Sequence, residues 1–312
     1  MERNVYITTN LNCNLRCLYC YEQDKTSKTS FDLEQVKKTL TATLSRKSDK
    51  GTLVNLHGGE PFLSFSKIKE LCEWAWAQNF PETFKFFATS NGTLIHGEIQ
   101  EWLYKNKHRF VVGLSLDGTR EMHNINRSNS FDQIDLEFFK KAWPNQGVKM
   151  TISPQSIHTL AEGVIFIHEN GFNDVRANLA EMIDWSDPSY LEIYKRELEK
   201  LSEYYLLHPE VEKCSLFSIY FASLVNNEVR KWCGVGTEME AIDVDGRKYP
   251  CHFFFEAVCG KEKSEQATAI DFTDPNQYTS EHCRSCLLLP ICPTCYGSNY
   301  VARGDIAARD LS

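Results

Sequence analysis

The sequence predicts an α/β fold: a partial (β/α)6 TIM-like barrel followed by a small cysteine-rich C-terminal domain. Three observations predict it. Short apolar strands alternate with amphipathic helical segments through the first two thirds of the 312 residues, which is the pattern of βα units and a parallel sheet. Polar residues and glycines follow several predicted strands, as at the functional rim of a barrel. The last 80 residues then hold seven of the twelve cysteines.

Each predicted strand is a short apolar run, and three of the six lead into a polar, glycine-containing turn. The strands cover 4–9, 51–59, 83–92, 109–118, 148–153 and 174–180. Between them, apolar residues recur at helical spacing, over 31–44, 64–79, 97–107, 130–143, 158–171 and 191–208. A hairpin is predicted at 238–250, with Asp245-Gly246 as its turn. We place a boundary near residue 210, which gives a core domain over 1–210 and an auxiliary domain over 211–312.

The composition indicates a globular chain, with 42% hydrophobic and 24% charged residues. No apolar run approaches the roughly 18 residues of a membrane helix, and the N-terminus does not resemble a signal peptide. We therefore expect a cytoplasmic protein, in which cysteines bind metal or do redox chemistry more often than they form disulfides. The net charge of -8 argues against a nucleic-acid partner, and we expect no membrane partner.

Three cysteines follow the first predicted strand within eight positions: Cys13, Cys17 and Cys20, spaced C-x3-C-x2-C. Three thiolates on one loop suit a [4Fe–4S] cluster with one iron left open. The spacing alone leaves two alternatives, which are zinc with a distant fourth ligand and three unrelated core cysteines.

The surrounding motifs resemble those of the radical S-adenosylmethionine (SAM) superfamily. The aromatic Tyr19 precedes Cys20, HGGEP (57–61) follows the second predicted strand, and SNG (90–92) and SLDG (115–118) follow the next two. The resemblance covers roughly residues 3–210. It implies that SAM chelates the open iron, and that reductive cleavage of SAM gives a 5′-deoxyadenosyl radical that abstracts hydrogen from a substrate.

The resemblance also implies which residues bind SAM. Gly58, Gly59 and Glu60 would receive the amino group, because glycines let the backbone approach and a carboxylate offsets an ammonium. Arg127 would bind the SAM carboxylate with its planar guanidinium, and Tyr19 would pack near the adenine. Contacts with the ribose and amino-acid part would come from Ser90, Asn91, Ser115 and Asp117. Read without the resemblance, these are ordinary turn residues and a loop charge.

The late cysteines resemble the SPASM auxiliary-cluster domain of peptide-modifying radical SAM enzymes. That resemblance implies one or two further [4Fe–4S] clusters, the nearer held by Cys233, Cys251 and Cys295 and the outer by Cys283, Cys286 and Cys292. One spacing is x2 where x3 is usual and the usual last cysteine is missing, so each set is one ligand short. Cys259 is the predicted fourth ligand of the nearer cluster. A single structural zinc on the C-x2-C pairs is the alternative.

The two resemblances together imply an enzyme that modifies a ribosomally made precursor peptide by cross-linking, epimerisation or backbone excision. The expected partners are the precursor peptide and an electron donor such as flavodoxin or ferredoxin. Because the core strand starts near residue 4, we expect no N-terminal leader-binding domain, so either a separate leader-peptide recognition protein or the sheet edge would hold a leader peptide. One alternative is anaerobic sulfatase maturation, in which an Asp follows the second SPASM cysteine. Here His252 stands there, and it is the candidate catalytic base. The other alternative is a non-enzymatic zinc-binding interaction protein.

Overall fold

The computed structural model describes residues 3–22, 25–218, 221–226, 231 and 233–309. Its strands are β1 (Arg3–Thr8), β2 (Asn10–Asn12), β3 (Thr26–Ser30), β4 (Thr52–His57), β5 (Phe84–Ser90), β6 (Phe110–Leu114), β7 (Val148–Ile152), β8 (Val175–Leu179), β9 (Met239–Ile242) and β10 (Lys248–Tyr249).

The helices of the first 207 residues are α1 (Leu33–Leu44), α2 (Phe65–Ala77), α3 (Glu98–Asn106), α4 (Arg120–Asn126), α5 (Leu136–Ala142), α6 (Leu160–Glu169) and α7 (Ser189–Leu207). The later helices are α8 (Phe221–Asn226), α9 (Glu256–Cys259), α10 (Lys261–Ala267), α11 (Pro275–Tyr278), α12 (Glu281–Arg284) and α13 (Tyr296–Arg303). Short 3-10 turns precede α2, α5, α6, α8, α9 and α13.

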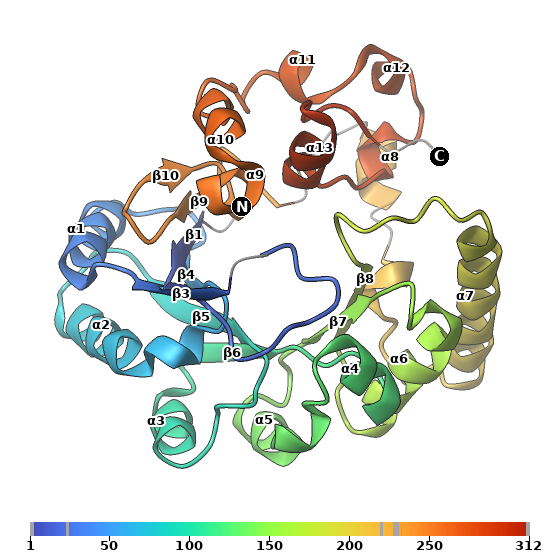
Figure 1. The fold of residues 1–312 in the computed structure, drawn as a ribbon, viewed down its shortest axis with the longest axis horizontal. Helices are drawn as coiled ribbons and strands as arrows, with labels where there is room; N and C mark the ends of the chain where they lie inside the picture. The colour runs from blue at the N-terminus through green and yellow to red at the C-terminus, as the bar shows by residue number, and fades with distance from the viewer. Residues whose placement is uncertain (1–2, 23–24, 219–220, 227–230, 232, 310–312) are drawn as a thin grey trace.

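Six parallel strands form an open barrel, as the sequence predicts. β1, β4, β5 and β6 are neighbours in one sheet, β7 and β8 pair separately, and a bridge between Ser115 and Lys149 joins the two groups. The helices follow one another around the outside in an arc, and the C-terminal elements lie across the open side of the barrel (Figure 1). The predicted fold class is confirmed.

Side chains alternate between the two faces of each strand, because successive residues of a strand point in opposite directions. The outward set is apolar and forms the main core with the helices; its members are Val5, Ile7, Val54, Leu56, Phe86, Ala88, Phe110, Val112, Leu114, Val148, Met150, Ile152, Val175 and Ala177. The inward set is mainly polar or aromatic: Asn4, Tyr6, Thr8, Leu53, Asn55, His57, Lys85, Phe87, Thr89, Val111, Gly113, Lys149, Thr151, Arg176 and Asn178. The barrel interior is therefore suited to polar ligands.

The C-terminal part joins the barrel through the predicted hairpin, which is confirmed. β9 pairs in parallel with β1, and β10 pairs antiparallel with β9. Alternate residues of β9 enter different cores: Ile242 belongs to the main core, whereas Met239 and Ala241 belong to a second core built from the C-terminal segment. The boundary near residue 210 stays a prediction, although Cys214 still packs in the main core.

Two features near the rim differ from the sequence expectation. The segment after β1 forms a small antiparallel pair, β2 with β3, and the stretch after β6 forms helix α4. The predicted helices at 130–143 and 158–171 begin as 3-10 turns and become α-helical only at Leu136 and Leu160. None of the helices in the described ranges is both long and apolar enough to cross a membrane.

Candidate active site

The loop that carries Cys13, Cys17 and Cys20 runs between β2 and β3, inside the arc of barrel strands (Figure 1). Its first part is fixed to the end of β4 by backbone hydrogen bonds. The Gly59 amide donates to the Asn10 carbonyl at 3.2 Å, and the Glu60 amide donates to the Asn12 carbonyl at 2.8 Å. The HGGEP segment therefore acts as the seat of the cysteine loop.

Gly58 and Gly59 must be glycines, because the backbone after β4 passes very close to the backbone of β2. A Cβ atom on Gly59 would lie 2.1 Å from the Asn12 carbonyl oxygen, and one on Gly58 would lie 2.4 Å from that of Asn10. Gly58 also has a φ of +138°, which side chains rarely permit. The sequence assigned these glycines to close approach of a ligand; the structure shows that they also admit the cysteine loop.

Two further anchors hold the loop. The side chain of Asn14 donates from Nδ2 to Thr93 Oγ1 at 2.8 Å, and its Oδ1 accepts from Asn91 Nδ2 at 3.0 Å. These two hydrogen bonds tie the loop to the end of β5. The Leu18 amide donates to the Asn126 carbonyl at 3.0 Å, beside the end of α4. The three cysteines are thus carried by a loop fixed on three sides, which is how a rigid ligand set is obtained.

A pocket at this rim collects almost all the residues that the sequence predicted to bind cluster or SAM. Its lining is Cys13, Cys17, Tyr19, Cys20, Tyr21, Glu22, Lys25, His57, Gly58, Gly59, Glu60, Thr89, Ser90, Asn91, Ser115 and Arg127. Of the predicted residues only Asp117 is outside it. Tyr21, Glu22, Lys25, His57 and Thr89 were not predicted. His57 and Thr89 could have been identified from the sequence, because they alternate with the outward-facing apolar residues of their strands and so face the barrel interior.

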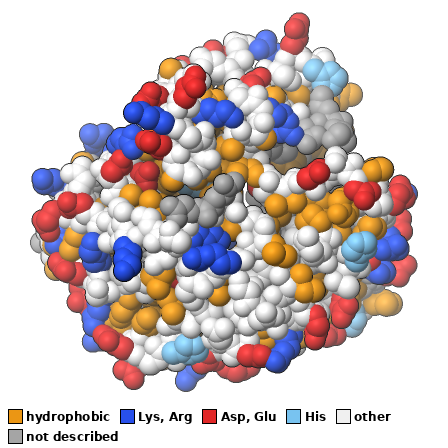
Figure 2. Space-filling model, viewed as in Figure 1, with side chains coloured by type: hydrophobic (Ala, Val, Ile, Leu, Met, Phe, Trp, Pro, Cys, Tyr) orange, Lys and Arg blue, Asp and Glu red, His pale blue; other side chains and the backbone are white. Residues whose placement is uncertain are grey.

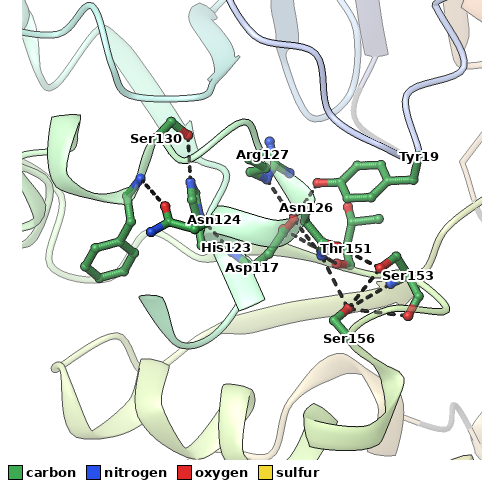
Figure 3. Close-up of polar contacts among 11 residues, drawn as sticks. Tyr19, Asp117, His123, Asn124, Asn126, Arg127, Ser130, Thr151, Ser153 and Ser156 are labelled. Atoms are coloured by element: carbon green, nitrogen blue, oxygen red, sulfur yellow. Dashed lines mark hydrogen bonds and ion pairs between the residues drawn. The ribbon is translucent and has the colours of Figure 1, made fainter. Parts of the chain in front are cut away.

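Asp117 is completely buried behind the pocket and holds two residues that line it (Figure 3). Its Oδ2 accepts from the Tyr19 hydroxyl at 2.6 Å and from Arg127 Nε at 2.8 Å, and its Oδ1 accepts from the Thr151 amide. Burial opposes the charge of Arg127, but Asp117 beside it raises the Arg127 pKa above its ordinary value. The geometry gives Asp117 a positioning role and does not support a direct contact with SAM.

Behind this ion pair, α4 presents buried polar side chains. His123 is fully buried; its Nδ1 accepts from the Asp117 amide at 3.3 Å, so the neutral ring carries its proton on Nε2, 3.1 Å from Ser130 Oγ. Burial, and then the nearby Arg127 charge, lower the pKa of His123 to about 4. The Asn126 carboxamide accepts from Ser153 Oγ at 2.6 Å (Figure 3). These contacts fix the segment that ends in Arg127.

Glu60 lines the pocket with a carboxylate that is 1% exposed. It accepts from Ser90 Oγ at 2.9 Å, from the Asn91 amide at 2.8 Å and from the Phe62 amide at 3.2 Å. Burial raises its pKa to about 7, although these donors act in the opposite direction. A cationic ligand in the pocket would favour the ionised form, which fits the predicted ammonium contact.

The residues of the first cysteine motif fit an iron–sulfur cluster by chemistry and by placement. All three thiols line one pocket on an anchored loop, and burial raises the pKa of Cys13 to about 11 and also raises that of Cys17. Iron binding would displace those protons. Within the described residues, no three His, Cys, Asp or Glu side chains already stand in metal-binding geometry.

Three of the late cysteines influence one another's thiol pKa values in the structure. The pKa of the buried Cys251 is raised well above its ordinary value, first by burial and then by Cys295 and Cys233, which places these three thiols near one another. Cys259 is the last residue of α9, and its Sγ is 3.4 Å from the carbonyl oxygen of Phe255, which precedes the helix. The role of Cys259 as the fourth ligand of the nearer cluster stays a prediction. Which residues hold auxiliary clusters stays a prediction.

The outer set is more open. Cys283 is buried in α12, whereas Cys286 and Cys292 are exposed. The Cys286 amide donates to the Cys283 carbonyl, which closes a turn between the first two.

On the face shown in Figure 2, Lys and Arg side chains are interspersed with Asp and Glu over both the barrel and the C-terminal part.

His252, the candidate base, reaches the barrel interior. Its ring stacks on that of His57, with centroids 4.7 Å apart and planes 23° from parallel. Tyr21 contacts both: its ring centroid lies 5.5 Å from that of His252, and its hydroxyl is 3.5 Å from His57 Nε2. His252 Nδ1 is buried and has no hydrogen-bond partner in the described structure. His252 therefore links the C-terminal part to the wall of the predicted SAM pocket.

Comparisons with known proteins agree with this geometry. Residues 7–153 match the family model described as the radical SAM superfamily. A cysteine-type anaerobic sulfatase-maturating enzyme of Clostridium perfringens is 23% identical over 324 aligned positions, covering 90% of this chain and 84% of the relative. The family match confirms the predicted cofactors, SAM and [4Fe–4S] iron–sulfur chemistry; the number of auxiliary clusters stays a prediction.

Two solved structures show the same fold. Native anSMEcpe with bound AdoMet superimposes with a TM-score of 0.68 at 21% identity, covering 93% of this chain and 87% of that one. Streptococcus suis SuiB bound to precursor peptide SuiA superimposes with a TM-score of 0.64 at 19% identity, covering 100% and 75%. At these identities the likeness establishes the fold, including the C-terminal part, and leaves the substrate open.

Proposed function

We propose that this radical SAM enzyme modifies a ribosomally made peptide or a protein side chain by hydrogen abstraction. The observation that carries the proposal is the placement of a C-terminal module, with its own cysteine trio and His252, directly beside the pocket that holds the first cysteine motif. Relatives named for sulfatase maturation, and a structure named as bound to its precursor peptide, support a peptidic substrate.

In this proposal the bound cluster and SAM supply the radical chemistry, and the chain supplies position and shielding. Gly58, Gly59 and Glu60 receive the SAM amino group, and Arg127, held by Asp117, receives its carboxylate. Tyr19 is fixed by the same carboxylate and forms part of the pocket wall. The electron donor is a flavodoxin or ferredoxin, and a separate protein recognises the leader peptide.

The reaction is precursor-peptide maturation, by cross-linking, epimerisation or backbone excision. Sulfatase maturation is the second candidate, and the curated relative from Clostridium perfringens favours it. The residue after Cys251 argues against it, because His252 stands where those enzymes place an aspartate base. His252 could accept a proton, but its ring is already stacked on His57.

The test is direct. Anaerobically reconstituted protein is incubated with SAM and a reductant, first alone and then with candidate peptides encoded beside its gene. We expect 5′-deoxyadenosine in both cases and a mass change only in a cognate precursor peptide. A change in a sulfatase-derived peptide, with none in the precursor, would establish the second candidate. Colourless protein with zinc and no iron would exclude both.

A further inference from the structure

Lys149 is an inward-facing cation of the barrel that none of the roles above uses. It lies on β7 between Val148 and Met150, which both face the main core, and it forms a parallel bridge with Ser115 at the pocket rim. Its side chain is partly buried. Within the described part of the chain, no hydrogen bond or ion pair engages its ammonium. A partly buried cation with no counter-charge beside it favours an anion in the same interior.

The two stacked imidazoles belong to the same interior. His57 is the last residue of β4, on its inward face, and His252 packs on it at 4.7 Å between ring centroids. The buried Nδ1 of His252 has no partner among the described residues. Buried nitrogens of this kind are normally satisfied. The interior therefore offers an ammonium and an unused imidazole nitrogen with no acceptor from the described chain.

The charges around Lys149 do not supply that acceptor. Arg176, paired with Lys149 across β7 and β8, is itself a cation and is bound to Asp174 at 2.8 Å. Burial, and then Arg176, lower the pKa of Lys149 to about 8, and burial, and then the Lys149 charge, lower the pKa of His57 to about 4. Glu181, which lines the hollow described next, is exposed.

A second hollow lies beside the aromatic residues that contact His252, and its lining does not include Lys149, His57 or His252. It is lined by Tyr19, Cys20, Tyr21, Thr151, Asn178, Glu181 and Phe253. Thr151 is two residues beyond Lys149 on the same face of β7, and Tyr21 and Phe253 contact His252. This hollow shares Tyr19, Cys20 and Tyr21 with the cysteine pocket. A substrate lying in it would be next to the predicted radical source.

We propose that Lys149, together with the His57–His252 pair, binds a carboxylate of the substrate, from an Asp or Glu side chain close to the residue that reacts. The identification of the substrate as a peptide rests on the proposed function; the carboxylate site does not. The other source of a carboxylate is SAM. Arg127 lines the cysteine pocket and is available for it, whereas Lys149 is not part of that lining.

The first test needs no peptide. Reconstituted, SAM-loaded protein is labelled with trace acetic anhydride, and acetylation of individual lysines is followed by mass spectrometry. Succinate should slow acetylation of Lys149 several-fold, and neutral succinamide should not. Lys85, an exposed lysine on the inner side of β5, serves as the internal control and should be unaffected by either. Equal labelling of Lys149 with and without succinate overturns the proposal.

The second test identifies the source of the carboxylate. Short peptides with a central Ser or Cys and randomised flanks are captured on immobilised SAM-loaded wild type, Lys149→Met and Lys85→Met. We expect the wild type and Lys85→Met to enrich Asp or Glu at one position, and Lys149→Met to lose that enrichment about tenfold, as for loss of a charged hydrogen bond. Iron content and circular dichroism verify that each variant is folded.

The outcomes separate the two proposals. Equal acidic enrichment by wild type and Lys149→Met overturns the carboxylate site, as does a tenfold loss of SAM affinity in Lys149→Met, which would assign the carboxylate to SAM. If succinate protects Lys149 but the wild type captures no peptide, the carboxylate site stands and the peptidic substrate of the proposed function is wrong.

Discussion

Asp117 does not line the pocket, yet at the scale of single residues it governs two residues that do. Its carboxylate is fully buried and binds both Tyr19 and Arg127. The SLDG motif suggested a ligand contact from its place at a strand end, which sequence reasoning can identify. It could not show that this side chain points away from the pocket, because that depends on Arg127 and Thr151, far away in the chain.

Asp117→Asn should therefore weaken SAM binding without touching SAM. The amide can still accept from Tyr19 but no longer pairs with the Arg127 charge, so we expect the unfolding free energy to fall by about 3 kcal/mol, as for one lost partner of a buried ion pair. SAM affinity should drop about tenfold, because Arg127 loses its fixed orientation. Calorimetric SAM titration and urea unfolding measure the two effects. Asp132→Asn, which breaks the exposed pair with Arg120, is the control and should change stability by less than about 1 kcal/mol.

The lowered pKa of His123 predicts that the unfolding free energy falls as the pH falls. Its pKa is about 4 in the folded chain against an ordinary value of 6.5, so between these values the unfolded chain binds more protons. The contribution of neutral His123 to the unfolding free energy should be fully present above about pH 6.5. It should be lost as pH falls, by about 2 kcal/mol at pH 5. His123→Gln should show a shallower decline between pH 7 and pH 5 in urea unfolding. Parallel declines in wild type and variant would show that His123 is not responsible.

At the scale of helices and strands, the sequence predicts the elements whose apolar residues recur periodically and misses the elements without that pattern. All six barrel strands and the β9–β10 hairpin were predicted, because their outward faces are apolar or their turn is Asp-Gly. Helix α4 was missed because its buried face is Met122, His123 and Asn126, which is mostly polar. The β2–β3 pair was missed because its strands contain few apolar residues.

The seat formed by HGGEP gives an element-scale prediction. Gly59→Ala would bring a Cβ to 2.1 Å from the Asn12 carbonyl oxygen, so the β2 backbone and the cysteine loop must move. We expect the iron bound by the first motif and SAM cleavage to fall at least tenfold, while the barrel core keeps its circular dichroism. Gly97→Ala is the control: nothing lies within 4 Å of its Cβ position, and only its φ of +51° is unfavourable, at a cost of about 1 kcal/mol. Normal iron and SAM cleavage in Gly59→Ala would refute the seat.

At the scale of the whole molecule, β9 joins the two cores. The change in cysteine density near residue 210 predicted two parts but gave no sign that a strand from the second would extend the sheet of the first. That pairing depends on β1, more than 230 residues earlier in the chain. It also brings His252 to His57, which no local sequence pattern could show. Long-range strand pairing is the kind of contact that single-sequence patterns do not encode.

The shared strand predicts that the barrel and the C-terminal module unfold together. Ile242 comes from β9 but is fully buried in the main core, while its neighbour Ala241 belongs to the second core. Ile242→Ala should therefore cost about 2–4 kcal/mol, as for other buried large-to-small changes, and the loss should extend to both parts. Hydrogen exchange measured by mass spectrometry in urea would report this as equal losses of protection in β5 and in α13. Ile270→Ala, at a partly buried position beside the second core, is the matched control and should have a smaller effect. If Ile242→Ala lowered protection in the C-terminal module alone, the two parts would be independent, and the placement of His252 beside His57 would then depend on docking between them instead of on one cooperative fold.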